Sequence, residues 1–255
     1  MFVNFLLELK QRNKALWWFG LFNLAVGIVC LFLMTADDYR ILNVSRWLKP
    51  MKFYFSVGLM ILTFGWLLHY LENAKRKKRF TWMLIISMFF ENGLIILQSI
   101  RGTTSHFNIK TSLDGMIFNF MGIFILIFTI TCVRICIEFF RQKQFSISNT
   151  YLWGIRLGIL FFILFSLEAG VMLSMMKHTV GGPDGSPGLP LVNWSRDYGD
   201  LRIAHFFGIH SLQILPLLGF YVAKTKKQIV VLSLVYFAFL SALFIQALKG
   251  IPLFF

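Results

Sequence analysis

Four polar side chains recur along one face of an apolar segment near the C-terminal end of the chain. They are Arg202, His205, His210 and Gln213, within a run predicted to form a helix over residues 202–222. At about 100° per residue, the four fall within an arc of about 140°. Polar and ionisable groups in hydrocarbon cost free energy unless they face a partner or a wet cavity. This face therefore predicts a functional site inside a membrane.

Two glutamates lie deep within other apolar runs, at a depth that matches one of these histidines. Glu91 and Glu168 are each about eight or nine residues from the outer end of a predicted span, and His210 is about eight residues into its own. At about 1.5 Å per residue, all three groups reach a depth of roughly 12–14 Å. We therefore expect the glutamates and the histidines to meet, although they come from different helices.

A polar stripe is predicted to climb from Glu91 toward the outer rim of its helix. Gln98 lies within about 20° of Glu91 around the helix, and Arg101 within about 80°. Together with the stripe on the histidine-bearing helix, it outlines a funnel that opens to the outside. The mouth and wall of this funnel are expected to include Arg101, His106, Asp114 and Arg202.

Glutamate, aspartate and histidine side chains on separate helices permit more than one chemistry. They can form a general acid–base pair or a proton relay, and they can bind a metal such as zinc or iron. We assign the catalytic role to Glu91, Glu168, His205 and His210. We assign ligand binding to Gln98, Arg101, Asp114, Arg202 and Gln213, and metal binding to His106, His205 and His210. The alternative is that these groups only hydrogen-bond the helices together.

The spacing of the histidines limits the metal prediction. His205 and His210 diverge by about 140° around a helix, so a divalent metal would take one of them together with His106 or a glutamate. Haem is the weaker option, because His205 and His210 cannot both bind one haem iron, which leaves His106 with His205. Cys132 and Cys136 share a helix face, but buried cysteine usually packs as a small apolar side chain.

The elements that must position these residues are membrane helices. Of the 255 residues, 57% are hydrophobic and only 14% are charged, against about 25% charged in a soluble domain. The mean hydropathy is +0.71. The net charge of +14 lies mainly in short Lys and Arg clusters between apolar runs, as is typical of membrane topology signals. This pattern predicts a polytopic membrane protein and argues against nucleic-acid binding.

Seven apolar windows have the length of a membrane span. They fall at about 16–34, 53–71, 80–100, 116–137, 152–176, 202–222 and 229–248. Basic clusters alternate with them, and the positive-inside rule then places the N-terminus in the cytoplasm and the C-terminus outside. We predict an all-α fold with one seven-helix transmembrane domain over residues 1–255, whose first span is retained rather than cleaved as a signal peptide.

The predicted outer loops are richer in turn-forming residues than the inner ones. Loop 177–201 contains Gly181-Gly-Pro-Asp-Gly-Ser-Pro-Gly-Leu-Pro190, whose composition predicts a compact irregular turn. This loop either caps the bundle or forms a lid over the site. His178 in this loop and His69 at an inner helix end are expected to be solvated. Gly154-Ile-Arg-Leu-Gly158 is a GxxxG pattern, which predicts a close contact between helices.

Three strings carry a resemblance to a known family. They are Arg101-Gly-Thr-Thr-Ser-His-Phe-Asn108, Gly181-Gly-Pro-Asp-Gly185 and Arg202-Ile-Ala-His-Phe-Phe-Gly-Ile-His-Ser-Leu-Gln213. Over nearly its whole length the chain resembles an uncharacterised bacterial family of seven-span integral membrane proteins. The resemblance implies a multi-pass protein of the bacterial inner membrane, and it supplies no activity.

A weaker resemblance links the chain to the ceramidase and progestin-receptor-like seven-helix hydrolases, which use Ser, Asp and three His around zinc. The side chains that match in type are Ser105, His106, Asp114, His205 and His210. The chain departs from those hydrolases in the spacing of its last two histidines and in the further span that follows them.

These features predict a membrane enzyme with an outward-facing acid–base or metal site that acts on a lipid or a small amphiphile. The alternative is a carrier, sensor or haem-binding protein for a small ligand. In that alternative Glu91 and Glu168 are the proton sites, with Arg101 and Arg202 as charge partners. The expected partners are the lipid bilayer and a small ligand or lipid substrate.

Overall fold

The computed structural model describes residues 2–186 and 188–253 and divides the chain into two compact units. Unit 1 extends to Thr131, and unit 2 begins at Cys132. The single domain over residues 1–255 stays a prediction, and each unit is described by itself.

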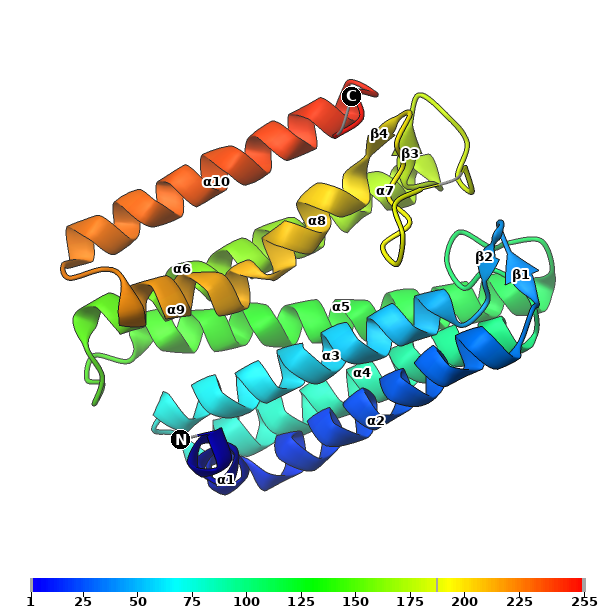
Figure 1. Cartoon of the computed structure of the whole chain (residues 1–255). Coiled ribbons are helices and arrows are strands. Elements are labelled where there is room, and N and C mark those ends of the chain that lie inside the picture. The colour runs from blue at the N-terminus through cyan, green and yellow to red at the C-terminus, as the bar shows by residue number, and fades with distance from the viewer. Residues whose placement is uncertain (1, 187, 254–255) are drawn as a thin grey trace. The chain divides into compact units, whose positions relative to one another are not determined.

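Unit 1 is built from long helices joined by short connections (Figure 1). Its elements are α1 (Phe2–Arg12), α2 (Lys14–Ala36), β1 (Arg40–Ile41), β2 (Val44–Ser45), α3 (Leu48–Leu67), the 3-10 turn η1 (Leu68–Tyr70), α4 (Ala74–Ile100) and the first part of α5 (Ser112–Arg141). Helices α2, α3 and α4 lie side by side in Figure 1 and contact one another. We predicted neither α1 nor the β1–β2 hairpin.

Local sequence signals explain where several helices begin. Asn13 caps α2 by accepting a hydrogen bond from the Leu16 amide at 3.1 Å, and Asn73 caps α4 through the Arg76 amide at 2.9 Å. Such side chains satisfy amides that the first helical turn leaves without a partner. In unit 2, Thr225 opens its last helix in the same way and forms a capping box with Gln228.

Unit 2 contains the last residues of α5 and the remaining helices. Its other elements are α6 (Asn149–Leu167), α7 (Ala169–Met175), β3 (Thr179–Val180), β4 (Gly199–Asp200), α8 (Leu201–Ile209), α9 (Ser211–Tyr221) and α10 (Lys226–Leu248). Strands β3 and β4 pair in antiparallel fashion. The loop predicted to be an irregular turn therefore contains a short sheet. Its Pro187 lies outside the described residues.

Two predicted spans of unit 2 are interrupted where we expected continuous helices. One break is the single residue Glu168, between α6 and α7, which together still form one candidate span over Asn149–Met175. The other is at His210, where α8 and α9 meet at 45°. Gly208 and Pro216 flank the second break, and glycine and proline are the residues at which helices bend. Both breaks place an ionisable residue of the predicted site at an irregular point of the backbone.

The GxxxG pattern of α6 packs against the backbone of α9, as predicted. A Cβ atom added to Gly154 would lie 2.5 Å from the Leu215 carbonyl oxygen, and one on Gly158 would lie 2.8 Å from the Ser211 carbonyl oxygen. Only glycine fits at such distances. The Ser211 hydroxyl also donates to the Gly158 carbonyl at 3.0 Å. Small residues thus let two apolar helices approach closely, as is common in membranes.

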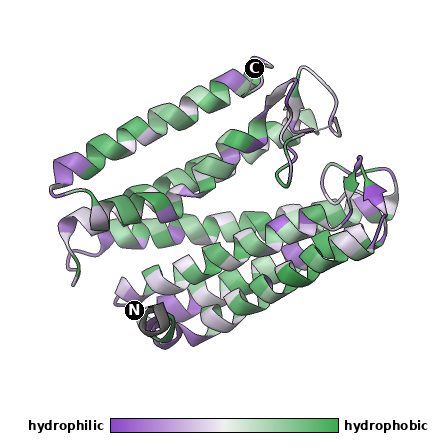
Figure 2. Cartoon of the chain, viewed as in Figure 1, coloured by the Kyte–Doolittle hydropathy of each residue, from purple (hydrophilic) through white to green (hydrophobic). Residues whose placement is uncertain are grey.

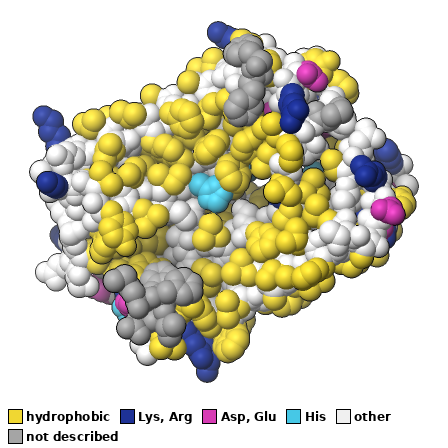
Figure 3. Space-filling view, viewed as in Figure 1, with side chains coloured by type: hydrophobic (Ala, Val, Ile, Leu, Met, Phe, Trp, Pro, Cys, Tyr) yellow, Lys and Arg dark blue, Asp and Glu magenta, His cyan; other side chains and the backbone are white. Residues whose placement is uncertain are grey.

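The helices have the lengths and surfaces of membrane spans. Within the described residues, six helices are long and apolar enough to cross a bilayer, and the number rises to seven if the bent α8–α9 pair is one span. Figure 2 shows mainly hydrophobic residues along the long helices, and Figure 3 shows hydrophobic side chains over most of the face in view. Phe32, Leu126 and Val235 are among many large apolar side chains that are exposed. These surfaces support a multi-pass membrane protein.

Candidate functional site

Unit 1 holds a buried carboxyl beside a histidine. Glu91 lies in α4 and is 3% exposed, and its Oε1 is 3.8 Å from Nε2 of His106. His106 belongs to the connection between α4 and α5, and its Nδ1 lies 3.1 Å from the Ser105 hydroxyl. The other carboxyl oxygen of Glu91 has no hydrogen-bond partner among the described residues. Glu91 thus pairs with a histidine that we had placed at the funnel mouth.

The predicted ligand-binding residues of unit 1 come together in a closed polar network. Asp114, in the first turn of α5, accepts hydrogen bonds from Arg101 at 2.8 Å, from Gln98 at 3.0 Å and from Thr111 at 2.7 Å. Arg101 also donates to the Gln98 side chain. The network joins the end of α4 to the start of α5. Since its members bond mainly to one another, it fixes the loop that carries His106.

Unit 2 holds a second carboxyl–imidazole pair, and here the structure brings together two residues that we expected to meet. Oε2 of Glu168 lies 3.9 Å from Nδ1 of His205. The same Nδ1 is 2.7 Å from the backbone oxygen of Phe165. A carbonyl oxygen can only accept, so Nδ1 carries the hydrogen and donates it. In the neutral imidazole, Nε2 then presents its lone pair.

The break at Glu168 explains why this carbonyl is available. The last four carbonyls of a helix have no partner within that helix, and Phe165 is among the last four residues of α6. Inside a membrane such a group must find a partner in the protein. His205 supplies it from α8, which passes so close to α6 that a Cβ on Gly208 would lie 2.2 Å from Phe165 Cβ.

Glu168 itself has no comparable partner. It is 8% exposed, and neither of its carboxyl oxygens accepts or donates a hydrogen bond within the described part of the chain. A buried polar group without a partner is costly, and each one in a folded protein calls for an explanation. The Glu168 carboxyl therefore lies at the helix break, buried and without a hydrogen-bond partner among the described residues.

The other polar residues of the α8–α9 face make separate contacts instead of one continuous stripe. Arg202 donates to the Asp200 carboxylate at 2.9 and 2.6 Å and to the Asn193 carbonyl at 2.6 Å. At the helix break, Nδ1 of His210 is 3.3 Å from the Gln213 side-chain oxygen. Arg202 thus anchors the preceding loop, where we had expected a charge partner for a ligand.

Loop 177–201 is also anchored by a histidine that we predicted to be solvated. Nδ1 of His178 is 2.8 Å from the Asp184 carboxylate, which also accepts from the backbone amides of His178 and Thr179. Burial alone would raise the pKa of Asp184, but the hydrogen bonds and charge of His178 hold that pKa well below its usual range. The prediction for His178 was wrong, because Asp184 lies across the turn and binds it.

One buried polar pair was missed. In unit 1, the Asn92 amide donates to the Asn23 side-chain oxygen at 2.7 Å, and Asn23 donates to the Phe19 carbonyl at 2.7 Å. Asn92 directly follows Glu91, so this pair ties α4 to α2 next to the buried carboxyl. An asparagine inside the apolar run of α2 was the signal that would have predicted a bond between helices.

The predicted metal site has no ligand cluster to support it. The described residues contain no group of three or more His, Cys, Asp or Glu side chains that could hold a metal ion. Metal binding by His106, His205 and His210 therefore stays a prediction. Cys132 and Cys136 are free and buried, which agrees with a packing role.

The chain matches no protein-family model, and comparisons with curated proteins and with solved structures find no match. The resemblance to a bacterial seven-span family likewise stays a prediction. The two carboxyl–imidazole pairs are the features of the described residues that bear most directly on function.

Proposed function

We propose that the protein is an integral membrane enzyme that uses a carboxyl–imidazole pair for acid–base chemistry on a lipid or a small amphiphile. The observation that carries this proposal is the pair in unit 2. Glu168 has both carboxyl oxygens buried and without a partner among the described residues, 3.9 Å from a histidine whose other ring nitrogen is left as an acceptor.

Their different surroundings give His205 and Glu168 different roles in proton transfer. Nδ1 of His205 donates to the Phe165 carbonyl, which fixes the ring and makes Nε2 the proton acceptor. Glu168 acts as the proton donor, because a carboxyl in an apolar site is costly in its charged form. A substrate that dissolves in the bilayer reaches such a pair without crossing water. Glu168 and His205 are therefore the residues on which we place catalysis.

The pair in unit 1 supports a second proton-handling position. His106 lies between the Ser105 hydroxyl at 3.1 Å and the Glu91 carboxyl at 3.8 Å. An imidazole between a hydroxyl and a carboxyl is the arrangement that activates a hydroxyl as a nucleophile, and recognition of such a site rests on geometry and roles. In the proposal Glu91 orients His106, and His106 accepts the proton.

The test compares native protein with Glu168→Gln in proteoliposomes made from a total bacterial lipid extract. Mass spectrometry of the recovered lipids should reveal a product that forms with native protein and not with the variant. The Glu168→Gln variant keeps the size of the side chain, so its melting temperature should stay close to the native value. Identical lipid profiles for the two proteins would contradict the enzyme proposal.

A carrier for a small ligand is the second candidate, and the helix breaks favour it. Discontinuous membrane helices commonly build the binding sites of transporters, and both breaks of unit 2 fall at residues of the predicted site. A proton-coupled carrier would change the pH inside proteoliposomes when its solute is added, and the lipids would stay unchanged. That pair of results would replace the enzyme with the carrier.

The proposal places the protein in the bacterial inner membrane, with the lysine-rich helix ends in the cytoplasm. Labelling of Ser186→Cys from outside intact cells, and of Lys75→Cys only after permeabilisation, is the expected pattern. Both positions are suitable because neither side chain belongs to a carboxyl–imidazole pair. The reverse labelling pattern would overturn the outward orientation of the loop at 177–201.

A further inference from the structure

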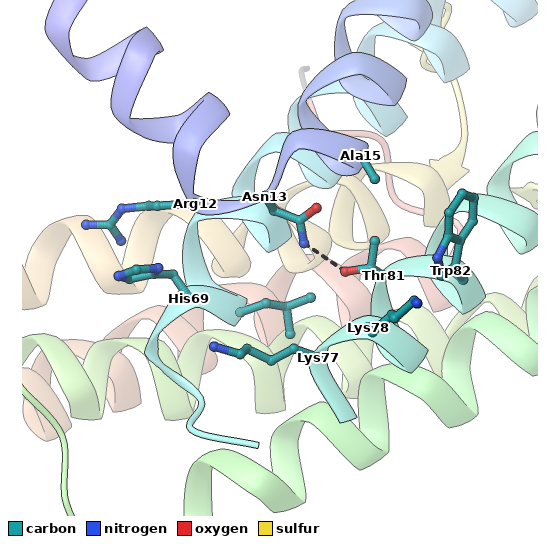
Figure 4. Close-up of a pocket in the computed structure, with 9 residues that line it drawn as sticks. Arg12, Asn13, Ala15, His69, Lys77, Lys78, Thr81 and Trp82 are labelled. Carbon is teal, nitrogen blue, oxygen red and sulfur yellow. Dashed lines mark hydrogen bonds between the residues drawn. The ribbon is translucent and has the colours of Figure 1, made fainter. Parts of the chain in front are cut away.

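A second polar site, unrelated to the carboxyl–imidazole pairs, lies at the lysine-rich end of unit 1. A pocket of about 280 Å³ opens there between the start of α2, the turn η1 and the first turns of α4. Its polar lining consists of Arg12, Asn13, His69, Lys77, Lys78 and Thr81. Figure 4 shows the nitrogen-bearing groups of Arg12, His69 and Lys77 on one side of the Asn13–Thr81 bond, and Lys78 beside Trp82 on the other.

Arg12 is held in place before any ligand arrives. Its guanidinium donates to the Glu8 carboxylate at 3.0 and 2.6 Å and to the Trp66 carbonyl at 3.3 Å. The same group lies 3.6 Å from the centre of the Trp66 ring. Because these contacts fix the side chain, little conformational entropy is lost when Arg12 binds an anion.

Lys77 and Lys78 give the pocket positive charge that Glu8 does not neutralise, because Glu8 pairs with Arg12. Lys77 and Lys78 lie in the first turns of α4, and the described part of the chain shows no ion pair for either ammonium group. Glu8 carries one negative charge against the three positive charges of Arg12, Lys77 and Lys78. The pocket therefore has an excess of positive charge that a bound anion would neutralise.

The floor of the pocket adds a hydrogen-bond donor. Asn13 donates its side-chain amide to the Thr81 hydroxyl oxygen at 2.7 Å, and Thr81 is buried. Since the Thr81 oxygen accepts this bond, its own hydrogen remains to be donated to a ligand. Guanidinium, ammonium and hydroxyl donors around one hollow fit the oxygens of a phosphate group.

Aromatic side chains indicate the depth at which the pocket opens. Trp82 lines the pocket and is 48% exposed, and Trp66 and Tyr70 lie against Arg12. Tryptophan and tyrosine are enriched where a membrane meets water, at the level of the lipid headgroups. Basic pockets at helix ends on the cytoplasmic side are suited to anionic headgroups. We propose that this pocket binds the phosphate group of an anionic phospholipid headgroup.

The test uses the full-length protein in detergent and follows its melting temperature as phosphatidylglycerol is added. A ligand that binds only the folded protein raises the melting temperature in a saturable way. The variant Lys77→Gln/Lys78→Gln should bind about 25-fold more weakly, at about fivefold per lysine, which corresponds to about 1 kcal/mol each. The matched control is Lys75→Gln/Arg79→Gln, which removes two charges from the same segment but not from the pocket lining.

The control separates a site from general attraction to basic residues. The proposal requires near-native binding by the control and weak binding by the pocket variant. Equal losses in both variants, or no loss in the pocket variant, would overturn it. The same melting-temperature titration is repeated with phosphatidylcholine and with inorganic phosphate. A saturable shift with inorganic phosphate alone would show that the pocket takes a free phosphate, and would overturn the lipid as its source.

Discussion

Each unit of this protein buries a glutamate next to a histidine, but the two units fix the histidine in different ways. In unit 1, His106 lies on a loop and points Nε2 toward Glu91 at 3.8 Å. In unit 2, His205 lies within a helix, and Nδ1 is held by the Phe165 carbonyl at 2.7 Å. The same two side chains thus form a loop-borne pair in one unit and a helix-borne pair in the other.

The difference matters because it decides which ring nitrogen is available. The helix break at Glu168 frees a backbone carbonyl, and this carbonyl sets the tautomer of His205. His106 instead contacts a hydroxyl, which can donate or accept. A pair whose tautomer is fixed by backbone is better preorganised for one direction of proton transfer. In the proposed function, unit 2 therefore takes the main acid–base role.

The largest expected effect is a difference in enzyme activity between the Glu168→Gln and Glu91→Gln variants. General acid–base catalysis contributes about 10²–10⁴-fold, so Glu168→Gln should lower the rate of the lipid reaction by at least about 100-fold. Glu91→Gln should have a smaller effect if unit 2 carries the main step. The rates are compared by product formation in proteoliposomes. Equal losses for both variants would show that the two pairs act in one reaction.

The second effect concerns packing, where the units also differ. A Cβ on Gly154 of unit 2 would lie 2.5 Å from the Leu215 backbone oxygen, whereas one on Gly20 of unit 1 would meet the tip of the Leu62 side chain at 2.6 Å. Backbone cannot move aside as a side chain can. Gly154→Ala should therefore lower the free energy of unfolding by about 1–3 kcal/mol.

Gly20→Ala is the matched control for this prediction. Leu62 can change rotamer, and alanine favours helix over glycine by about 1 kcal/mol, so the net loss should be small. Unfolding in a denaturing detergent measures both variants. A larger loss for Gly20→Ala would mean that side-chain tips, not backbone, limit helix approach here.

The positions of the spans could be predicted from sequence because they depend on the length of apolar runs. Each of the seven windows is mainly helical. The depth argument matched Glu168 to His210, whereas the structure places Glu168 beside His205 and His210 beside Gln213. Helical periodicity assumes an unbroken helix, and so it missed the breaks at Glu168 and His210. The break at His210 also explains why the predicted polar face of the α8–α9 segment is not one continuous stripe.

Residues on loops were harder to place, because periodicity gives no geometry there. His106 was expected at a funnel mouth, and its place beside Glu91 depends on how the connection after α4 turns back. The role of Arg202 as a loop anchor could have been predicted from the sequence. Asp200 directly precedes an apolar run and caps α8 by accepting from the Arg202 amide at 3.0 Å. A capping aspartate two residues before an arginine is well placed to bind its side chain.

The third effect is the free-energy cost of burying the Glu168 carboxyl without a hydrogen-bond partner. Removing a buried polar group that has no hydrogen bond relieves a penalty of about 1–3 kcal/mol. Glu168→Met should therefore raise the free energy of unfolding by about 1 kcal/mol while abolishing activity. Glu91→Met should gain less, since one of its oxygens faces His106. Destabilisation by Glu168→Met would instead favour a structural role for this carboxyl.

The smallest effect compares, as pH changes, two carboxylates that anchor loops. Asp37 binds Arg46 beside β1–β2, and Asp184 binds His178 beside β3–β4. Hydrogen bonds from the Tyr39 backbone and the Trp47 indole lower the pKa of Asp37, and Arg46 adds to this. The pKa of Asp184 is also held low, through His178, despite its burial. A carboxyl with a lowered folded-state pKa stabilises the protein above its unfolded pKa of about 3.9, and this contribution is lost as pH falls through the folded value. As pH falls, both anchors should therefore hold until strong acid is reached.

The anchors should separate on the alkaline side. Arg46 stays charged, whereas His178 is charged only when protonated, so raising the pH weakens the bond to Asp184 alone. A charge-assisted bond exceeds a neutral one by about 1 kcal/mol, which predicts a roughly fivefold lower protection factor against hydrogen exchange at β3–β4 and an unchanged protection factor at β1–β2. His178→Gln keeps a donor without a charge and should remove the pH dependence. If the pH dependence persists in that variant, the loop is held by contacts other than the His178–Asp184 pair.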